Sequence, residues 1–207
     1  MKANWIDIKK LIKNSSNDVK VELLSEQNTD LIESINVSED SVLGQVLSHI
    51  SGVIINGYLR IYGFTGSLDI NKWNDKIKAY YPGNKLIIAH DVFGGVFAIN
   101  NGDFDDNIRN IWYFAPDTLQ WENLEINYAD FISWVLSDKV LDFYESFLWS
   151  DAALLLKNIG IDEGISVYPC LWSQELNIES ASKKRVSFDE ILGMNKEYQK
   201  KFKLAQN

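Results

Sequence analysis

Four short runs of β-branched and aromatic residues dominate the middle of the chain, with glycine, asparagine, aspartate or proline between them. They are Leu86–His90, Val96–Asn100, Ile111–Phe114 and Gln120–Glu125. Runs of this length and composition are typical of β-strands joined by tight turns. The spacing therefore predicts an antiparallel meander over about residues 86–125.

Patterns on either side of this meander predict helices and further strands. Residues 52–63 predict a hairpin with Asn56-Gly57 as its two-residue turn, because both residues tolerate positive φ. Ser41 is a candidate N-cap for a helix that ends near His49, and a short helical turn is expected at Asp30–Ser34.

The order of these elements predicts an α+β fold, with a central, mostly antiparallel sheet flanked by helices. No internal repeat or long linker interrupts the 207 residues, so we expect residues 1–207 to form a single domain. Its expected parts are an N-terminal helix and strand (about 4–24), a sheet core (about 52–125), helices (about 127–159) and a C-terminal strand and helix (about 165–203).

The amino-acid composition and net charge restrict the kinds of molecule that the protein is expected to bind. The chain has 46% hydrophobic residues, as globular proteins do, and a net charge of -9. Negative charge argues against nucleic acid, because phosphate neutralisation requires a basic face, and it favours a basic partner. The single cysteine excludes an intrachain disulfide. The N-terminus lacks the apolar segment of a signal peptide, and no apolar run approaches the roughly 20 residues that span a bilayer. We therefore expect a cytoplasmic protein that binds no membrane.

The stretch LIIAHDVFGGVFAINNGD holds the most suggestive chemistry, His90 beside Asp91. A histidine oriented by a carboxylate can act as a general base. Adjacent residues of a strand point to opposite faces, however, so we do not expect these two side chains to meet. Gly94 and Gly95 predict a turn or bulge between two strands. They would also let a partner's backbone approach closely, and the sequence leaves that alternative open.

The other chemical motifs favour structural roles. Cys170 has the apolar neighbours of a core thiol. Asp103, Asp105 and Asp106 do not have the spacing of a calcium-binding loop. The two histidines lie too far apart in the sequence for a zinc cluster with one cysteine. We expect no metal, no cofactor and no catalytic residue set.

Trp112 and Trp121 lie on the two strands that flank the last turn of the meander. Helices that follow must pack on the sheet, which favours two covered faces. A face left open would instead suit a partner, or a second copy of the chain, because exposed aromatic residues are favoured at interfaces. The candidate partner-binding or ligand-binding residues are therefore His90, Asp91, Gly94, Gly95, Trp112 and Trp121.

Longer stretches resemble the bacterial domain-of-unknown-function family 2625. They are SVLGQVLSHISGVIINGYLRIYG, LIIAHDVFGGVFAINNG, NIWYFAPDTLQWENLEINYADFISWVLSD, FYESFLW and GISVYPCLWS. The resemblance covers roughly Leu43 to Trp172, and YFAPDTLQWE is its most specific part. That family is in turn similar to the SUKH superfamily, through a strand, a Gly-Gly turn, a strand ending near Asn100 and a helix of the YADFISWVL type. This second resemblance implies an α+β fold and protein binding, often as immunity proteins that neutralise toxins, and it brings no catalytic residues.

Two functions from different classes follow. The first is a non-enzymatic protein-binding module, which the SUKH resemblance specifies as an immunity-type protein that binds a toxin or another protein. The acidic charge suits a cationic partner. The alternative is a small-molecule-binding protein or small enzyme with a site around His90 and Asp91, which requires a pocket where these groups converge. A homo-oligomeric structural protein is a third possibility.

Overall fold

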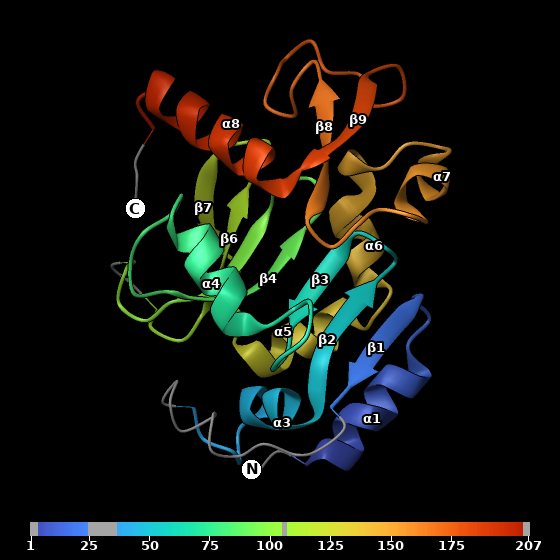
Figure 1. Ribbon diagram of the computed structural model, residues 1–207, viewed down its shortest axis with the longest axis vertical. Helices are drawn as coiled ribbons and strands as arrows, with labels where there is room; N and C mark the ends of the chain where they lie inside the picture. The colour runs from blue at the N-terminus through green and yellow to red at the C-terminus, as the bar shows by residue number, and fades with distance from the viewer. Residues whose placement is uncertain (1–3, 25–36, 105–106, 205–207) are drawn as a thin grey trace.

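The computed structural model describes residues 4–24, 37–104 and 107–204 (Figure 1). Its main feature is a seven-stranded sheet, in which every neighbouring pair of strands is antiparallel. The strands are β1 (Val19–Leu23), β2 (Ile50–Ile55), β3 (Leu59–Tyr62), β4 (Leu86–Asp91), β5 (Val96–Ile99), β6 (Ile111–Ala115) and β7 (Gln120–Asn123). Their order in the sheet is their order in the chain, so the predicted four-stranded meander is confirmed and extends to seven strands.

Local sequence explains the first hairpin and the helix before it. Asn56 and Gly57 have φ angles of 52° and 76°, the positive values predicted for them. The connection is one residue longer than the predicted two-residue turn, because Ile55 pairs with Leu59 and Tyr58 also lies in the loop, with its N–H donating to the Ile55 carbonyl at 3.1 Å. The Ser41 side chain accepts a hydrogen bond from the Gly44 N–H at 3.0 Å and caps α3 (Val42–His49), as predicted. The helical turn expected at Asp30–Ser34 lies outside the described residues.

Helices cover both faces of the sheet. In the described part of the chain they are α1 (Trp5–Asn14), α3, α4 (Ile70–Lys78), α5 (Tyr128–Val135), α6 (Lys139–Tyr144), α7 (Ala152–Leu156) and α8 (Phe188–Lys201). In Figure 1, α4 and α8 lie in front of the sheet, whereas α5 and α6 lie behind it. The long helical pattern predicted after Asn127 is divided into α5, α6, a 3₁₀ turn and α7. Asp138 and Asp151 are the N-cap residues of α6 and α7, although neither side chain makes a capping hydrogen bond.

Adjacent residues of the central strands reach opposite helical layers. The His90 ring on β4 packs on Trp73 of α4 and Phe188 of α8, with centroid distances of 4.2 and 4.4 Å. The next residue, Asp91, instead accepts a hydrogen bond from Tyr144 of α6 at 3.0 Å. The α+β fold is therefore three-layered around the sheet, with apolar side chains filling both interfaces.

A separate two-stranded sheet closes the C-terminal part, formed by β8 (Glu163–Tyr168) and β9 (Ser182–Ser187). The sequence predicts β8 but not β9, because SKKRVS is mostly polar and charged. This segment is identified as a strand only through its antiparallel pairing with β8, in which each of its six residues faces one residue of β8. The Ile165 N–H donates to the Val92 carbonyl at 2.7 Å, which attaches this hairpin to the turn after β4.

Candidate binding site

His90 is an interior residue with no exposed surface. Its Nδ1 lies 2.7 Å from the Tyr62 hydroxyl, and its Nε2 lies 3.4 Å from the Arg60 guanidinium. Because a guanidinium only donates hydrogen bonds, Nε2 is the acceptor and Nδ1 carries the proton of the neutral ring. Burial first, and then the charges of Arg60 and Lys76, lower the pKa of His90 well below its ordinary value. The ring is thus held neutral inside the protein.

Arg60 joins this ring to the C-terminal part of the chain. Its guanidinium donates to the carbonyls of Gly160 and Glu163 at 2.7 and 2.8 Å. Burial lowers the pKa of Arg60 to about 10, which leaves the group charged at neutral pH. The polar contacts of His90 and Arg60 therefore fasten elements together across the interior.

Asp91 is also fully buried, and both of its oxygens are engaged. Oδ1 accepts from the N–H groups of Phe93 and Gly95, each at 2.9 Å. Oδ2 accepts from the hydroxyls of Tyr113 and Tyr144 at 2.9 and 3.0 Å. Burial raises the pKa of Asp91, although these four hydrogen bonds oppose the shift. The structure does not bring His90 and Asp91 together, since their side chains have separate partners on opposite faces of the sheet.

Gly94 and Gly95 form the turn between β4 and β5, and other side chains of the protein occupy the space beside both glycines. Gly94 has a φ of 98°, which suits glycine, and a Cβ there would lie 2.5 Å from Ile191 of α8. A Cβ on Gly95 would lie 2.1 Å from Oδ2 of Asp91 and 2.3 Å from the Tyr113 hydroxyl. The close approach that these glycines allow is therefore used by α8, Asp91 and Tyr113.

Trp112 and Trp121 are partly buried. Trp112 stacks on Phe104 with ring centroids 4.1 Å apart, and Trp121 lies 5.4 Å from the same ring. The ammonium of Lys85 lies 5.4 Å from the Trp121 ring and forms a 2.7 Å ion pair with Asp103. Both tryptophans belong to a packed cluster at one end of the sheet, and the structure gives them no shared cavity with His90 or Asp91.

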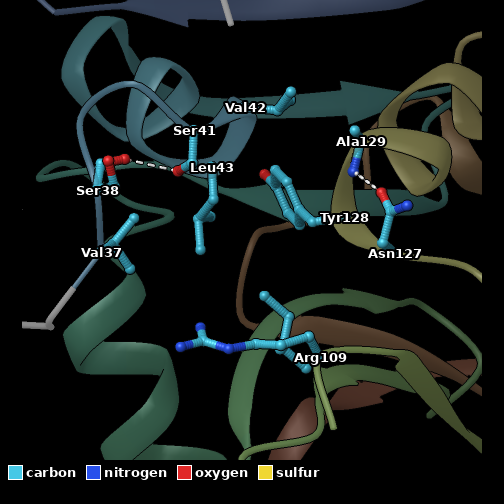
Figure 2. A pocket seen from close by; sticks show the side chains of 10 residues that line it. Val37, Ser38, Ser41, Val42, Leu43, Arg109, Asn127, Tyr128 and Ala129 are labelled. Atoms are coloured by element: carbon cyan, nitrogen blue, oxygen red, sulfur yellow. Dashed lines mark hydrogen bonds between the residues drawn. The ribbon is translucent and has the colours of Figure 1, made fainter. Parts of the chain in front are cut away.

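A surface cavity with a volume of about 730 Å³ lies between the N-termini of α3 and α5. Figure 2 shows its walls. Apolar side chains come from the segment before α3, from α3 itself and from β5, and Arg109 enters from the turn before β6. The lining residues are Val37, Ser38, Ser41, Val42, Leu43, Ile99, Arg109, Asn127, Tyr128 and Ala129.

None of the candidates chosen from the sequence lines this pocket. Its two most distinctive polar groups are the Arg109 guanidinium and the Tyr128 hydroxyl, and sequence reasoning missed both. A signal for Arg109 was present, because it follows three aspartates in DFDDNIRN and is the only cation in that stretch. Tyr128 gives no such signal, since a tyrosine at the start of an apolar helix usually packs in the core.

A second concavity, of about 570 Å³, runs between the segment that follows β7, α5 and α6. Its residues are Leu124, Ile126, Asp130, Ser133, Trp134, Ser137, Lys139 and Phe143. Trp134 and Phe143 meet edge to face, with centroids 5.1 Å apart and an angle of 84° between the rings. We call this surface the aromatic groove.

Exposed carboxylates accumulate in the segment that forms the aromatic groove. Residues 117–145 contain seven acidic side chains, all of them exposed, and a single basic side chain, Lys139. The acidic residues are Asp117, Glu122, Glu125, Asp130, Asp138, Asp142 and Glu145. Asp130 lines the aromatic groove together with Lys139, and the other six carboxylates are exposed on the same stretch of chain, which therefore carries an excess of negative charge.

Metal-ligating residues do not cluster in the described ranges, where no group of three histidine, cysteine or carboxylate side chains could hold an ion. Partial burial acts to raise the pKa of the Asp103 carboxyl group, but its contacts with the Lys85 ammonium and with the N–H groups of Asn84 and Lys85 outweigh this effect and lower the pKa. Asp105 and Asp106 lie outside the described residues. No helix that the structure describes is long and apolar enough to cross a bilayer.

Fold and surface together define an α+β protein with a seven-stranded meander, a sealed polar interior and two concave surfaces near α5. The chain belongs to the protein family of unknown function DUF2625, whose family model matches residues 1–191. The match covers nearly the whole chain and includes all the strands and helices described above up to the first turn of α8.

Two relatives extend over the same length. The uncharacterized protein YbfG of Escherichia coli (strain K12) is 32% identical over 210 residues, which cover 98% of this chain and 94% of the relative. An uncharacterized protein of Haemophilus influenzae (strain ATCC 51907 / DSM 11121 / KW20 / Rd) is 28% identical over 211 residues, which cover 97% of this chain and 92% of the relative. The similarity therefore concerns the entire fold.

Proposed function

We propose that this protein is a non-enzymatic binding module that docks a protein partner on the aromatic groove. The observation that carries the proposal is the combination of half-buried aromatic side chains with exposed carboxylates on one short segment. Tryptophan and other aromatic residues contribute disproportionately to binding energy at protein interfaces. Trp134 and Phe143 are the residues we expect to make the central contacts.

Charge specifies the kind of partner. Seven exposed carboxylates against one lysine in residues 117–145 give this surface a negative potential within a chain whose net charge is already -9. Such a potential accelerates encounter with a cationic protein and disfavours an acidic one. The partner we propose presents an apolar side chain for the groove and basic residues around it.

The accessibility of the interior groups favours binding over catalysis. His90 and Asp91, the pair on which an enzyme at this position would depend, have no exposed surface and fully assigned hydrogen bonds. A substrate would have to displace α4, α8 or α6 to reach them. The resemblance to the SUKH superfamily supports a more specific form of the proposal, an immunity-type protein that blocks a basic toxin in the cytoplasm.

Charge reversal on the groove tests this function. The variant Glu125→Lys/Asp142→Lys changes carboxylates adjacent to the lining residues Leu124, Ile126 and Phe143. The control variant Asp75→Lys/Glu175→Lys changes the net charge equally at exposed positions on α4 and in the loop after β8. Immobilised wild type and both variants are incubated with lysate of the native host, and retained proteins are quantified and then titrated in pure form.

We expect one cationic protein to bind the wild type and the control with similar Kd and the groove variant at least tenfold more weakly, because close charge pairs contribute about 1.5 kcal/mol or more. Its affinity should fall as salt is added. Equal binding to both variants, or no specific protein on any of the three, contradicts the proposal.

A further inference from the structure

We propose that the pocket between α3 and α5 binds a small organic anion, a carboxylate or phosphate group carried on an apolar body. Arg109 supplies the charge, the Tyr128 hydroxyl supplies a hydrogen-bond donor, and the two helix N-termini supply the surrounding potential. This site is distinct from the aromatic groove and does not depend on the function proposed for it.

The first observation is an arginine without a partner. Within the described residues, no carboxylate or carbonyl accepts a hydrogen bond from the Arg109 guanidinium, although the chain carries 29 acidic residues against 20 basic ones. Figure 2 shows this side chain extending along the pocket beneath Leu43. A guanidinium offers paired N–H donors that match the oxygens of a carboxylate or phosphate.

The backbone holds Arg109 in place at a cost. Its φ angle is 78°, a left-handed conformation that is unfavourable for a non-glycine residue. The conformation is fixed by hydrogen bonds in the turn, where the Arg109 N–H donates to the Asn100 carbonyl and the Asn100 N–H donates to the Asn110 carbonyl, each at 2.9 Å. The side chain is therefore directed at the pocket by a rigid turn.

The second observation is the Tyr128 hydroxyl. Only 7% of this residue is exposed, and its hydroxyl has no hydrogen-bond partner. In Figure 2 the ring projects from the start of α5 into the space between α5 and α3, with the hydroxyl at its far end. A buried hydroxyl without a partner is destabilising, and an anion in this pocket would provide the missing acceptor.

Two helices of eight residues each begin at this pocket and add to its positive potential. The first turn of α3 contains no acidic residue. In the described residues the N–H groups of Val42 and Leu43 have no acceptor, since the Ser41 side chain takes only the Gly44 N–H. The first turn of α5 does contain Asp130, whose Oδ2 accepts from the Asn127 side chain at 2.6 Å. The α3 end is therefore the more favourable side for an anion.

The apolar walls and the volume limit what the anion is attached to. Val37, Val42, Leu43 and Ile99 line the cavity, and about 730 Å³ lies within the range of pockets that hold small organic molecules. A ligand with a short apolar or aromatic body and one anionic group fits both the polar and the apolar lining.

Phenyl phosphate, benzoate and inorganic phosphate are the probes for this site, with benzyl alcohol as the uncharged comparison and sodium chloride at matched ionic strength. Thermal unfolding and titration calorimetry follow binding to the wild type, to Arg109→Gln and to Tyr128→Phe. Lys157→Gln is the control, because it removes one positive charge from an exposed position outside the pocket.

We expect saturable binding of phenyl phosphate or benzoate to the wild type and to Lys157→Gln, tighter than that of inorganic phosphate, and none of benzyl alcohol. Arg109→Gln should weaken that binding at least tenfold, and Tyr128→Phe about fivefold. The two organic anions, compared directly, tell a phosphate site from a carboxylate site. Absence of saturable binding by all three anions, or equal binding to Arg109→Gln, overturns the proposal.

Discussion

The buried interior around β4 and the open pocket between α3 and α5 both contain charged and hydroxyl side chains. The two regions differ in whether those side chains have hydrogen-bond partners. Asp91 is fully buried and accepts four hydrogen bonds, two of them from tyrosine hydroxyls. Arg109 is exposed and Tyr128 nearly buried, and neither side chain has a hydrogen-bond partner among the described residues. The oxygens of Asp91 find all their partners within the fold, whereas the Arg109 guanidinium and the Tyr128 hydroxyl lie beside a cavity and remain available to a ligand.

Removing the Asp91 carboxylate should give the largest effect. Asp91→Ala leaves two N–H groups and two tyrosine hydroxyls without their acceptor inside the protein, so we expect the free energy of unfolding to fall by about 3–5 kcal/mol. Urea denaturation followed by tryptophan fluorescence measures it. Asp138→Ala, at an exposed position without a side-chain cap bond, should change stability by less than about 0.5 kcal/mol. Equal effects of the two substitutions would contradict the structural role of Asp91.

Acidification should weaken the fold through His90. The pKa of His90 is lowered in the folded state, so the unfolded chain takes up a proton first as the pH falls below about 6.5. Stability from this group is therefore present above pH 6.5 and lost below it, by up to about 2 kcal/mol at pH 5. Urea unfolding at pH 7.5, 6.5, 5.5 and 5.0 gives the slope. His90→Gln should lack this component, and parallel slopes for the two proteins would show that His90 titrates normally when folded.

A matched pair of tyrosines gives the smallest and sharpest comparison. Tyr144→Phe removes a hydroxyl that donates to Asp91, and we expect a loss of about 1.5–3 kcal/mol. Tyr128→Phe removes a hydroxyl that has no partner, so stability should stay within about 0.5 kcal/mol of the wild type or rise slightly. Both changes delete one oxygen from a tyrosine that is at least 93% buried. Similar losses in both variants would mean that Tyr128 has an acceptor in solution.

Much of the fold could be predicted from the sequence because its signals are local. Short apolar runs and turn residues gave the meander, the Asn56-Gly57 hairpin and the Ser41 cap, and the strand pairings agree. β9 could not be predicted in this way. Its residues are polar, and only pairing with β8 makes them a strand.

The pocket between α3 and α5 could not be predicted from the sequence for a related reason. Residues from positions 37–43, 99, 109 and 127–129 form it, and no pattern within any one of these segments indicates that they meet. At His90 and Asp91 the residue types alone would suggest a catalytic site that the structure does not form. Their strand positions correctly predicted that the two side chains would point apart, but burial on both faces depends on helices placed far away in the chain.

The sequential order of the seven strands also bears on how the chain folds during synthesis. Each strand pairs with the one made just before it, so the sheet can grow by short-range steps, and such local topologies fold quickly. Phe188, which covers His90, and the Glu163 carbonyl, which accepts from Arg60 across 103 residues, emerge much later. A ribosome-bound chain that ends before α8 would therefore display an aromatic sheet face to chaperones, and the final helix would complete folding by covering it.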